Sequence, residues 1–162
     1  MKVQLFANKI VPVAFSLLPA VMGATNARAM VTAICLQESG LTHRRQVRGP
    51  ARSYAQFEIM GVLEVMTGRT TRVHAEAALN ALDCEGFSDI EALAAIEHND
   101  ILTAVFTRLL LWGDPMQVPG KADEEGAWQM YLRRWRPGKP HRERWGPAWR
   151  AAWAVIEQGD TA

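Results

Sequence analysis

The stretch from residue 99 to residue 115 limits the possible folds most strongly, because it has the clearest helical pattern in the chain. Asn99 is suited to cap the start of a helix, and the Gly-Asp-Pro run at 113–115 is suited to end it. Between them, apolar residues recur at the spacing of one helical face, at Leu102, Val105, Phe106, Leu109 and Trp112. The pattern predicts a helix over 99–112 whose apolar face belongs to the core.

Most of the remaining chain also has helical patterns. We expect helices over 25–39, 58–66, 71–82 and 88–96, a helix with Trp128, Tyr131, Leu132 and Trp135 on one face, and a last helix with Pro147 in its first turn. Residues 41–57 contain four arginines and a Gly-Pro pair, which predicts a loop with at most a small β-hairpin near 53–57. With 162 residues and no repeat or linker, the sequence predicts a single, mainly α domain over 1–162.

The composition gives little indication of a charged partner or a cofactor. The net charge is +1, so we expect no nucleic-acid partner. We also expect a monomer without stable insertion into a membrane. Cys35 lies on the apolar face of its predicted helix, which favours a buried free thiol over a bridge to Cys84. The histidines lack a metal-binding spacing and no glycine-rich phosphate loop is present, so we expect no metal and no cofactor.

The first thirty residues have two interpretations. Two lysines precede an apolar run at 10–23, and ARA at 27–29 is similar to a signal-peptidase site, which is typical of a secretory signal. However, the run contains Pro12 and Pro19, and cleavage after Ala29 would cut the helix predicted over 25–39. The run is also short for a membrane span. We therefore interpret it as a buried N-terminal helix, with an export signal as the alternative.

Glu38 is the first candidate for a chemical role. It follows Ile34 by four residues and Cys35 by three, so it continues the apolar stripe of its helix. Burial raises the pKa of a carboxyl group, and the negative end of the helix dipole acts in the same direction. A glutamate in this position can keep its proton near neutral pH and act as a general acid. The alternative is a helix-end side chain that reaches into water.

Glu58 is the second candidate, because it opens a predicted helix where the dipole favours the ionised carboxylate. A protonated and an ionised carboxyl group side by side are what glycoside hydrolysis requires. The alternative is a helix N-terminal charge without a catalytic role.

The loop over 41–57 and the aromatic residues offer candidates for substrate binding. Its arginines, among them Arg45, can bind an anion or a sugar carboxylate, although a solvated loop or a brace for Glu58 fits the pattern as well. Tyr54 and Tyr131 can stack on sugar rings, as can the tryptophans near Tyr131, but core packing at helical spacing is the alternative for all of them.

Two segments together resemble a known superfamily. LQESG at 36–40 and GPARSYAQFE at 49–58 are similar to the goose-type lysozymes and lytic transglycosylases of phages and prophages. The resemblance implies a lysozyme-like fold, with two helical parts and a cleft between them. It also implies that Glu38 is the catalytic glutamate, with Ser39 as its neighbour and Gln56 as the loop glutamine. Tyr131 is similar to a tyrosine that the family places near the catalytic acid.

The resemblance implies an enzyme of the endolysin type, made in the cytoplasm of a bacterial host and acting on the cell wall in the periplasm. We expect it to bind peptidoglycan glycan strands and to cleave the β-1,4 bond between N-acetylmuramic acid and N-acetylglucosamine. Glu38 is expected to be the general acid, and Glu58 is expected to position water. The alternatives are a lytic transglycosylase that leaves a 1,6-anhydro end, a chitinase-type glycosidase, and a non-catalytic virion or wall-binding module.

Overall fold

The computed structural model describes residues 1–161, and these residues are mainly helical, as predicted. The N-terminal segment comprises α1 (Val3–Leu5), the π-helical turn η1 (Phe6–Ile10), α2 (Val11–Ser16) and the 3-10 turn η2 (Ala20–Met22). The longer helices are α3 (Thr25–Ser39), α4 (Ile59–Thr67), α5 (Arg72–Asn80), α6 (Asp89–His98), α7 (Asp100–Trp112), α8 (Glu124–Trp135) and α9 (Arg142–Asp160). Within residues 1–161, β structure is limited to the isolated bridges Arg45–Arg52 and Arg52–Phe57, which lie in the loop that was expected to hold a small hairpin.

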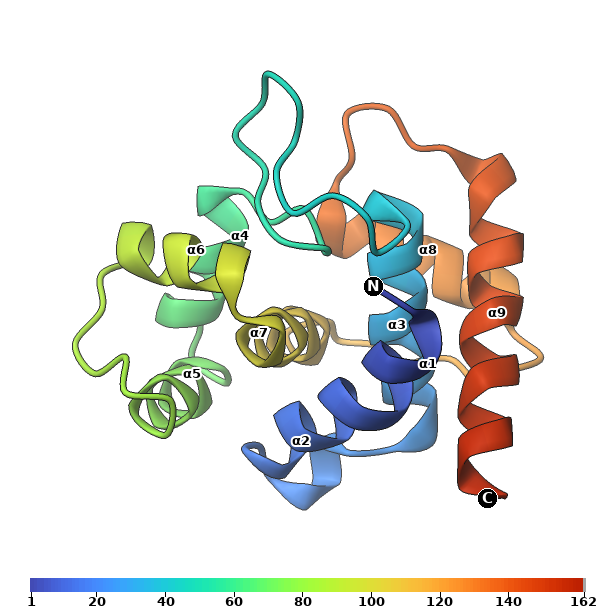
Figure 1. Ribbon diagram of the computed structural model, residues 1–162, viewed down its shortest axis with the longest axis horizontal. Helices are drawn as coiled ribbons and strands as arrows, with labels where there is room; N and C mark the ends of the chain where they lie inside the picture. Colours follow the sequence, from blue (N-terminus) through green and yellow to red (C-terminus); the bar gives the residue numbers. More distant parts are fainter. Residues whose placement is uncertain (162) are drawn as a thin grey trace.

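Helix α7 lies at the centre of the molecule, between α4–α6 on one side and α3 and α9 on the other (Figure 1). Leu102, Val105, Phe106 and Leu109 are fully buried, which confirms the predicted core face, whereas Trp112 is only partly buried. The Asn99 side chain caps the helix by accepting hydrogen bonds from the backbone amides of Ile101 and Leu102. Thr103 and Thr107 on α7 are buried as well. Their hydroxyl groups can be buried because they donate hydrogen bonds to the backbone carbonyls of Ile96 and Thr103.

Helices α3 and α9 run side by side in opposite directions (Figure 1). Most residues of α3 are buried, including the free thiol of Cys35, so the predicted polar face of this helix is small. Gly40 ends α3 with φ +60°, and its amide donates to Leu36 O at 3.0 Å. Helix α9 begins at Arg142, so the prediction that Pro147 lies in its first turn is wrong. The buried Trp145 explains the earlier start, since its side chain anchors the first turn in the core.

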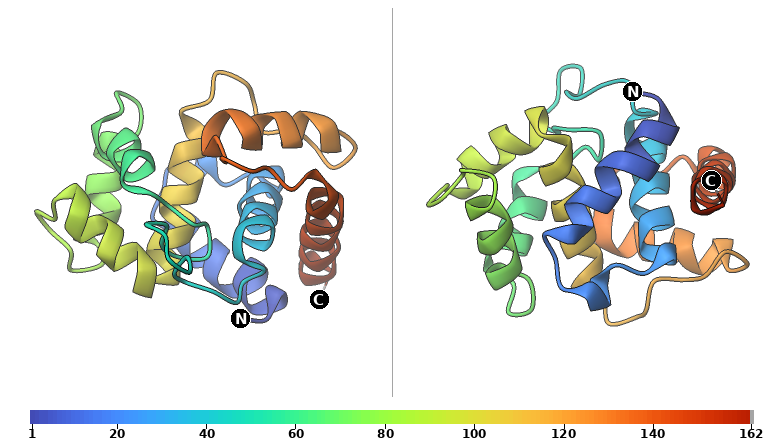
Figure 2. Two further views of the ribbon diagram at one scale, coloured as in Figure 1. Left: turned by 90° about the horizontal axis from the view of Figure 1, so that it is seen from above. Right: turned by 60° about the horizontal axis from the view of Figure 1, so that its bottom comes forward.

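The N-terminal segment is helical and its apolar face is buried, as the buried-helix interpretation predicted. Phe6, Val11 and Phe15 are among the core residues, and α2 packs on α7 and α3 (Figure 2, right). The π-helical turn ends two residues before Pro12, which has no amide hydrogen to continue the α-helical ladder. No helix within residues 1–161 is both long and apolar enough to cross a membrane.

Helices α4, α5 and α6 form the other side of the molecule (Figure 1). The predicted capping box at the start of α6 is present: the Ser88 hydroxyl accepts from the Glu91 amide, and the Glu91 carboxylate accepts from the Ser88 amide at 2.8 Å. The loop over 41–57 connects α3 to α4 and therefore joins the two sides next to Glu38.

Candidate active site around Glu38

Glu38 lies in the last turn of α3 and is partly exposed. The Tyr131 hydroxyl donates a hydrogen bond of 2.6 Å to its Oε1 atom. Burial is the largest influence on this carboxyl group and raises the pKa of Glu38 to about 6. The Tyr131 hydrogen bond and the charge of Arg144 oppose this rise of the pKa, whereas the charge of Glu58 adds to it. The raised pKa agrees with the sequence prediction. Because it lies below 7, most Glu38 side chains are still ionised at pH 7.

A stack of aromatic rings holds Tyr131 in place. Its ring is 2% exposed and lies almost parallel to Trp145, with ring centroids 5.1 Å apart, and to Trp135, at 6.3 Å. Burial, together with the Glu38 carboxylate, raises the pKa of the Tyr131 hydroxyl far above its usual range. Tyr131 is therefore a permanent hydrogen-bond donor to Glu38. Its ring faces are covered by other aromatic rings, so the predicted stacking on a sugar does not fit this placement.

A pocket of about 240 Å³ opens beside Glu38. It is lined by Glu38, Ser39, His43, Arg45, Gln46, Val47, Gln56 and Arg144. In Figure 1 these residues come from the upper end of α3, the loop over 41–57 above it, and the start of α9. The structure thus brings together four of the residues singled out in the sequence, namely Glu38, Ser39, Arg45 and Gln56.

Ser39 and Gln56 hold the loop by hydrogen bonds within the protein. The Ser39 hydroxyl is buried and donates to Tyr54 O at 2.8 Å, which ties the end of α3 to the loop. The Gln56 side chain donates from Nε2 to Ser53 O at 2.6 Å, and Gln56 has φ +51°. Both side chains line the pocket, but the Ser39 hydroxyl and the Gln56 Nε2 group are engaged by the backbone, so shaping the pocket is the role that this geometry supports.

Tyr54 lies in the core, so the prediction that its ring stacks on a sugar is wrong. Its side chain is 6% exposed, its edge packs against Phe6, and the Arg44 guanidinium covers its ring at 4.3 Å from the centroid. The ring is thus part of the core beneath the loop and offers no face to a sugar. Core packing, the alternative interpretation, is the correct one.

Glu58 is the N-cap residue of α4, as the sequence predicted, and it is exposed. It does not belong to the residues that line the Glu38 pocket. Among residues 1–161 its carboxylate has no hydrogen-bond or ion-pair partner, but it is close enough to Glu38 for its charge to raise the pKa of that residue. The two carboxyl groups are electrostatically linked without sharing one pocket.

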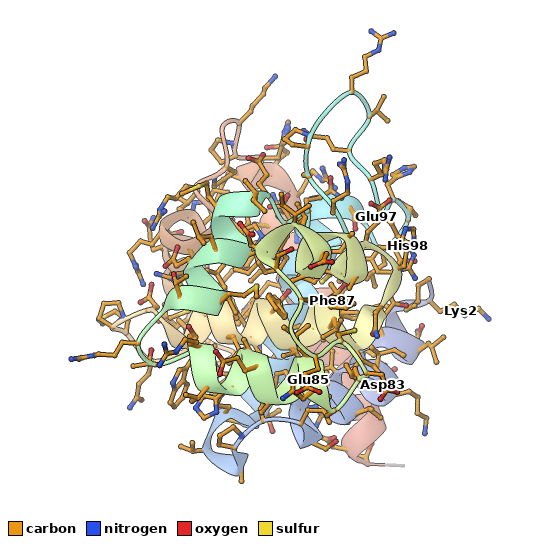
Figure 3. All side chains as sticks on the ribbon, turned by 90° about the vertical axis from the view of Figure 1, so that its left-hand side faces the viewer. Lys2, Asp83, Glu85, Phe87, Glu97 and His98 are labelled. Carbon is orange, nitrogen blue, oxygen red and sulfur yellow. The ribbon has the colours of Figure 1, made fainter. Side chains whose placement is uncertain are left out.

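Three of the four arginines of the loop are engaged by acids at the end of α6 and the start of α7, neither of which is Glu58. Arg45 binds the Glu97 carboxylate through two hydrogen bonds of 2.9 Å, and Arg52 Nε lies 3.1 Å from the same group. Arg44 pairs with Asp100. Glu97 is 6% exposed and lies at the base of the loop (Figure 3). Arg45 lines the pocket with its side chain 63% exposed, so a contact with substrate stays a prediction.

Glu97→Gln is expected to lower the free energy of unfolding by about 2 kcal/mol, because a buried acid that pairs with two arginines loses its charge. The value is below the ~3–5 kcal/mol of fully buried pairs, since Arg45 is largely in water. The loop should also loosen, so the amides of Arg52 and Phe57, which bond to each other's carbonyls, should exchange hydrogen faster. Urea unfolding and amide exchange measure both effects. Glu76→Gln, at an exposed position on α5, is the matched control.

Arg144 and Gln37 complete the surroundings of Glu38, and neither was predicted from the sequence. Arg144 is exposed on the first turn of α9, and it was not recognised because that helix was predicted to start later. Gln37 is buried and its Nε2 donates to His141 O at 3.0 Å, which fastens α3 to the start of α9. A glutamine beside a catalytic candidate carries no sequence signal for such a long-range contact.

Comparison with protein-family models, with curated proteins and with solved structures gives no match. Within residues 1–161 no group of three or more histidine, cysteine, aspartate or glutamate side chains is arranged to hold a metal ion.

Proposed function

We propose that the protein is a glycosidase that cleaves the β-1,4 bond between N-acetylmuramic acid and N-acetylglucosamine in peptidoglycan, with Glu38 as the general acid. The observation that carries the proposal is a carboxyl group with a pKa of about 6, held by Tyr131 at the edge of an open pocket. The resemblance of LQESG and GPARSYAQFE to lysozyme-like enzymes supports the choice of substrate. The action on the cell wall of a bacterial host is part of the same proposal.

In this mechanism Glu38 donates its proton to the glycosidic oxygen as the bond to the sugar breaks. With a pKa of about 6, about half of the Glu38 side chains are protonated at pH 6 and about a tenth at pH 7. After the transfer, the new carboxylate is stabilised by the Tyr131 hydrogen bond and by the positive charge of Arg144. The carboxylate can then assist the second step as a base, because its proton affinity is intermediate.

Two outcomes of the second step are compatible with this acid. If Glu58 positions a water molecule, the product has a reducing end and the enzyme is a muramidase. If Glu58 only raises the pKa of Glu38, the C6 hydroxyl of the muramic acid attacks C1 of the same sugar and a 1,6-anhydro end forms. The exposed position of Glu58 outside the pocket lining favours the second outcome, that of a lytic transglycosylase, more than the sequence did.

Mass spectrometry of the products from purified peptidoglycan tests the proposal and separates these outcomes. Muropeptides with a reducing muramic acid end identify hydrolysis, and an anhydro end identifies the transglycosylase. Release of fragments from chitin oligomers with none from peptidoglycan would contradict the substrate. An intact glycan together with binding of the protein to the wall would instead identify a non-catalytic wall-binding module.

Arg144→Gln and Glu58→Gln should move the pH dependence of activity in opposite directions. Loss of the Arg144 charge removes an influence that lowers the pKa of Glu38, so the fall of kcat/KM at high pH should shift to a higher pH. Loss of the Glu58 charge removes an influence that raises the pKa of Glu38, so the same limb should shift to a lower pH. The apparent pKa of the limb, from initial rates of turbidity clearing, measures both.

The control for this pair is Arg150→Gln, which removes an exposed arginine from the same helix. In Arg150→Gln the fall of kcat/KM at high pH should coincide with that of the wild-type protein, because Arg150 pairs with Glu124. Shifts of the Arg144 and Glu58 variants in the same direction would contradict the proposed electrostatic arrangement.

A further inference from the structure

A second cavity, which we name the Arg108 cavity, is lined by residues from the start of α3, the end of α7 and the segment that joins α7 to α8. It measures about 450 Å³, within the range of small-molecule sites. Its lining includes Val21, Asn26, Arg108, Trp112 and Met116, and it shares no residue with the Glu38 pocket. Ala27 of this cavity and Glu38 are about 16 Å apart along α3.

The guanidinium group in this cavity is a buried cation without an acidic partner. Arg108 is 3% exposed, and its Nε donates to Met22 O at 2.8 Å. Its Nη1 is closed to solvent and has no hydrogen-bond partner, and no carboxylate within residues 1–161 forms an ion pair with the group. Burial lowers the pKa of Arg108 to about 10, so it keeps its charge at neutral pH. An unpaired buried charge is costly, and an anion would compensate it.

Asp114 also lines the cavity, but it is not available to neutralise Arg108. Its carboxylate accepts two hydrogen bonds of 3.1 Å from Arg133 and one of 2.9 Å from the Met116 amide. The Asp114 carboxylate is therefore engaged by Arg133 and Met116. The positive charge of Arg108 therefore remains the uncompensated charge of the cavity.

The rest of the cavity is largely apolar. The Trp112 ring lies beside the guanidinium, with 5.0 Å between the ring centroid and Cζ of Arg108. At the rim, Val21 is 71% exposed and Met116 is 63% exposed. Exposed apolar side chains next to a hidden cation match a ligand that has both an apolar part and one negative charge.

We propose that the Arg108 cavity binds a small amphiphilic anion, whose carboxylate or phosphate pairs with the Arg108 guanidinium while its apolar part packs on Trp112, Met116 and Val21. Because Nη1 is closed to solvent, the anion enters together with a movement of the cavity wall. The planar guanidinium offers two parallel N–H donors, which suits either headgroup. This site is separate from the proposed glycosidase site, and its test does not depend on activity.

Octanoate is the probe, titrated below its micelle concentration into the full-length protein. The NMR signals of the Arg108 Nε–H and of the Trp112 indole N–H should shift and saturate. Acetate, which lacks the tail, and 1-octanol, which lacks the charge, should bind at least about tenfold more weakly. Octyl phosphate in place of octanoate shows which headgroup the cavity prefers, and tight binding of either one supports the proposal.

Val21→Asp places a negative charge on the exposed rim without disturbing the core, and it should weaken octanoate binding at least about tenfold. Ile90→Asp makes the same change at an exposed position on α6, far along the chain from the cavity, and should leave the affinity within about twofold. Equal binding of octanol and octanoate would overturn the proposal. An unchanged affinity in Val21→Asp, or no shift of the Arg108 signal at millimolar octanoate, would do so as well.

Discussion

Glu38→Gln is expected to lower kcat/KM on peptidoglycan by about 10²- to 10⁴-fold, which is the contribution of a general acid. Glutamine has nearly the same shape and can still accept the hydrogen bond from Tyr131, but it has no acidic proton to give to the glycosidic oxygen. Clearing of a peptidoglycan suspension measures the rate. A variant that clears the suspension at the wild-type rate would remove Glu38 from the mechanism.

The same variant carries its own control for folding. Because the pKa of Glu38 rises from an ordinary 4.5 to about 6 on folding, the native state holds the proton more tightly than the unfolded state. The ionised Glu38 side chain therefore lowers the free energy of unfolding above pH 6, because a buried carboxylate is less favourable than one in water. Glu38→Gln should raise the free energy of unfolding by up to about 2 kcal/mol at pH 8 and leave it nearly unchanged at pH 4. An inactive and stabilised variant separates lost chemistry from lost structure.

Trp145→Ala is expected to lower the free energy of unfolding by about 3–5 kcal/mol, as for other large aromatic side chains removed from a core. Trp145 is fully buried, stacks on Tyr131 and Trp149, and donates from its indole to Glu124 O. The cavity left behind lies directly against Tyr131. Tyr131 should then hold Glu38 less firmly, so activity should fall even at temperatures where the variant is folded.

Denaturant unfolding with an unchanged m-value measures the loss in Trp145→Ala. Trp145→Phe is the matched control, because it keeps an aromatic ring in the stack and gives up only the indole hydrogen bond and part of the volume. We expect its loss to be less than half that of the alanine variant. A loss below about 1 kcal/mol for Trp145→Ala would show that α9 does not depend on this residue.

Local patterns explain the part of the fold that could be predicted. The apolar face of α7, the capping box of Ser88 and Glu91, and Gly40 at the end of α3 depend on residues within a few positions of each other. The raised pKa of Glu38 belongs to the same group, because burial follows from its place on the apolar stripe. Its catalytic role stays a prediction.

Long-range contacts explain what could not be predicted. Glu97 is 52 residues from Arg45, and no pattern near either residue indicates that they pair. The burial of Tyr54 depends on Phe6 and on the position of Arg44, which only the packed loop determines. The start of α9 was placed too late because proline usually favours the first helical turn, whereas here the burial of Trp145 extends the helix in front of Pro147.

The pairing of the first helices with the last one has a consequence for synthesis on the ribosome. Asn8 bonds to Val155 O, and Glu38 meets Tyr131, so both contacts join segments that leave the ribosome far apart in time. At about 5–20 residues per second, the buried face of the N-terminal segment waits at least about 7 s for α9. Nascent chains should therefore be ready substrates for chaperones during this interval. The contacts that surround Glu38 therefore form only after Tyr131 and the start of α9 have left the ribosome, so a shorter nascent chain does not yet contain the candidate site.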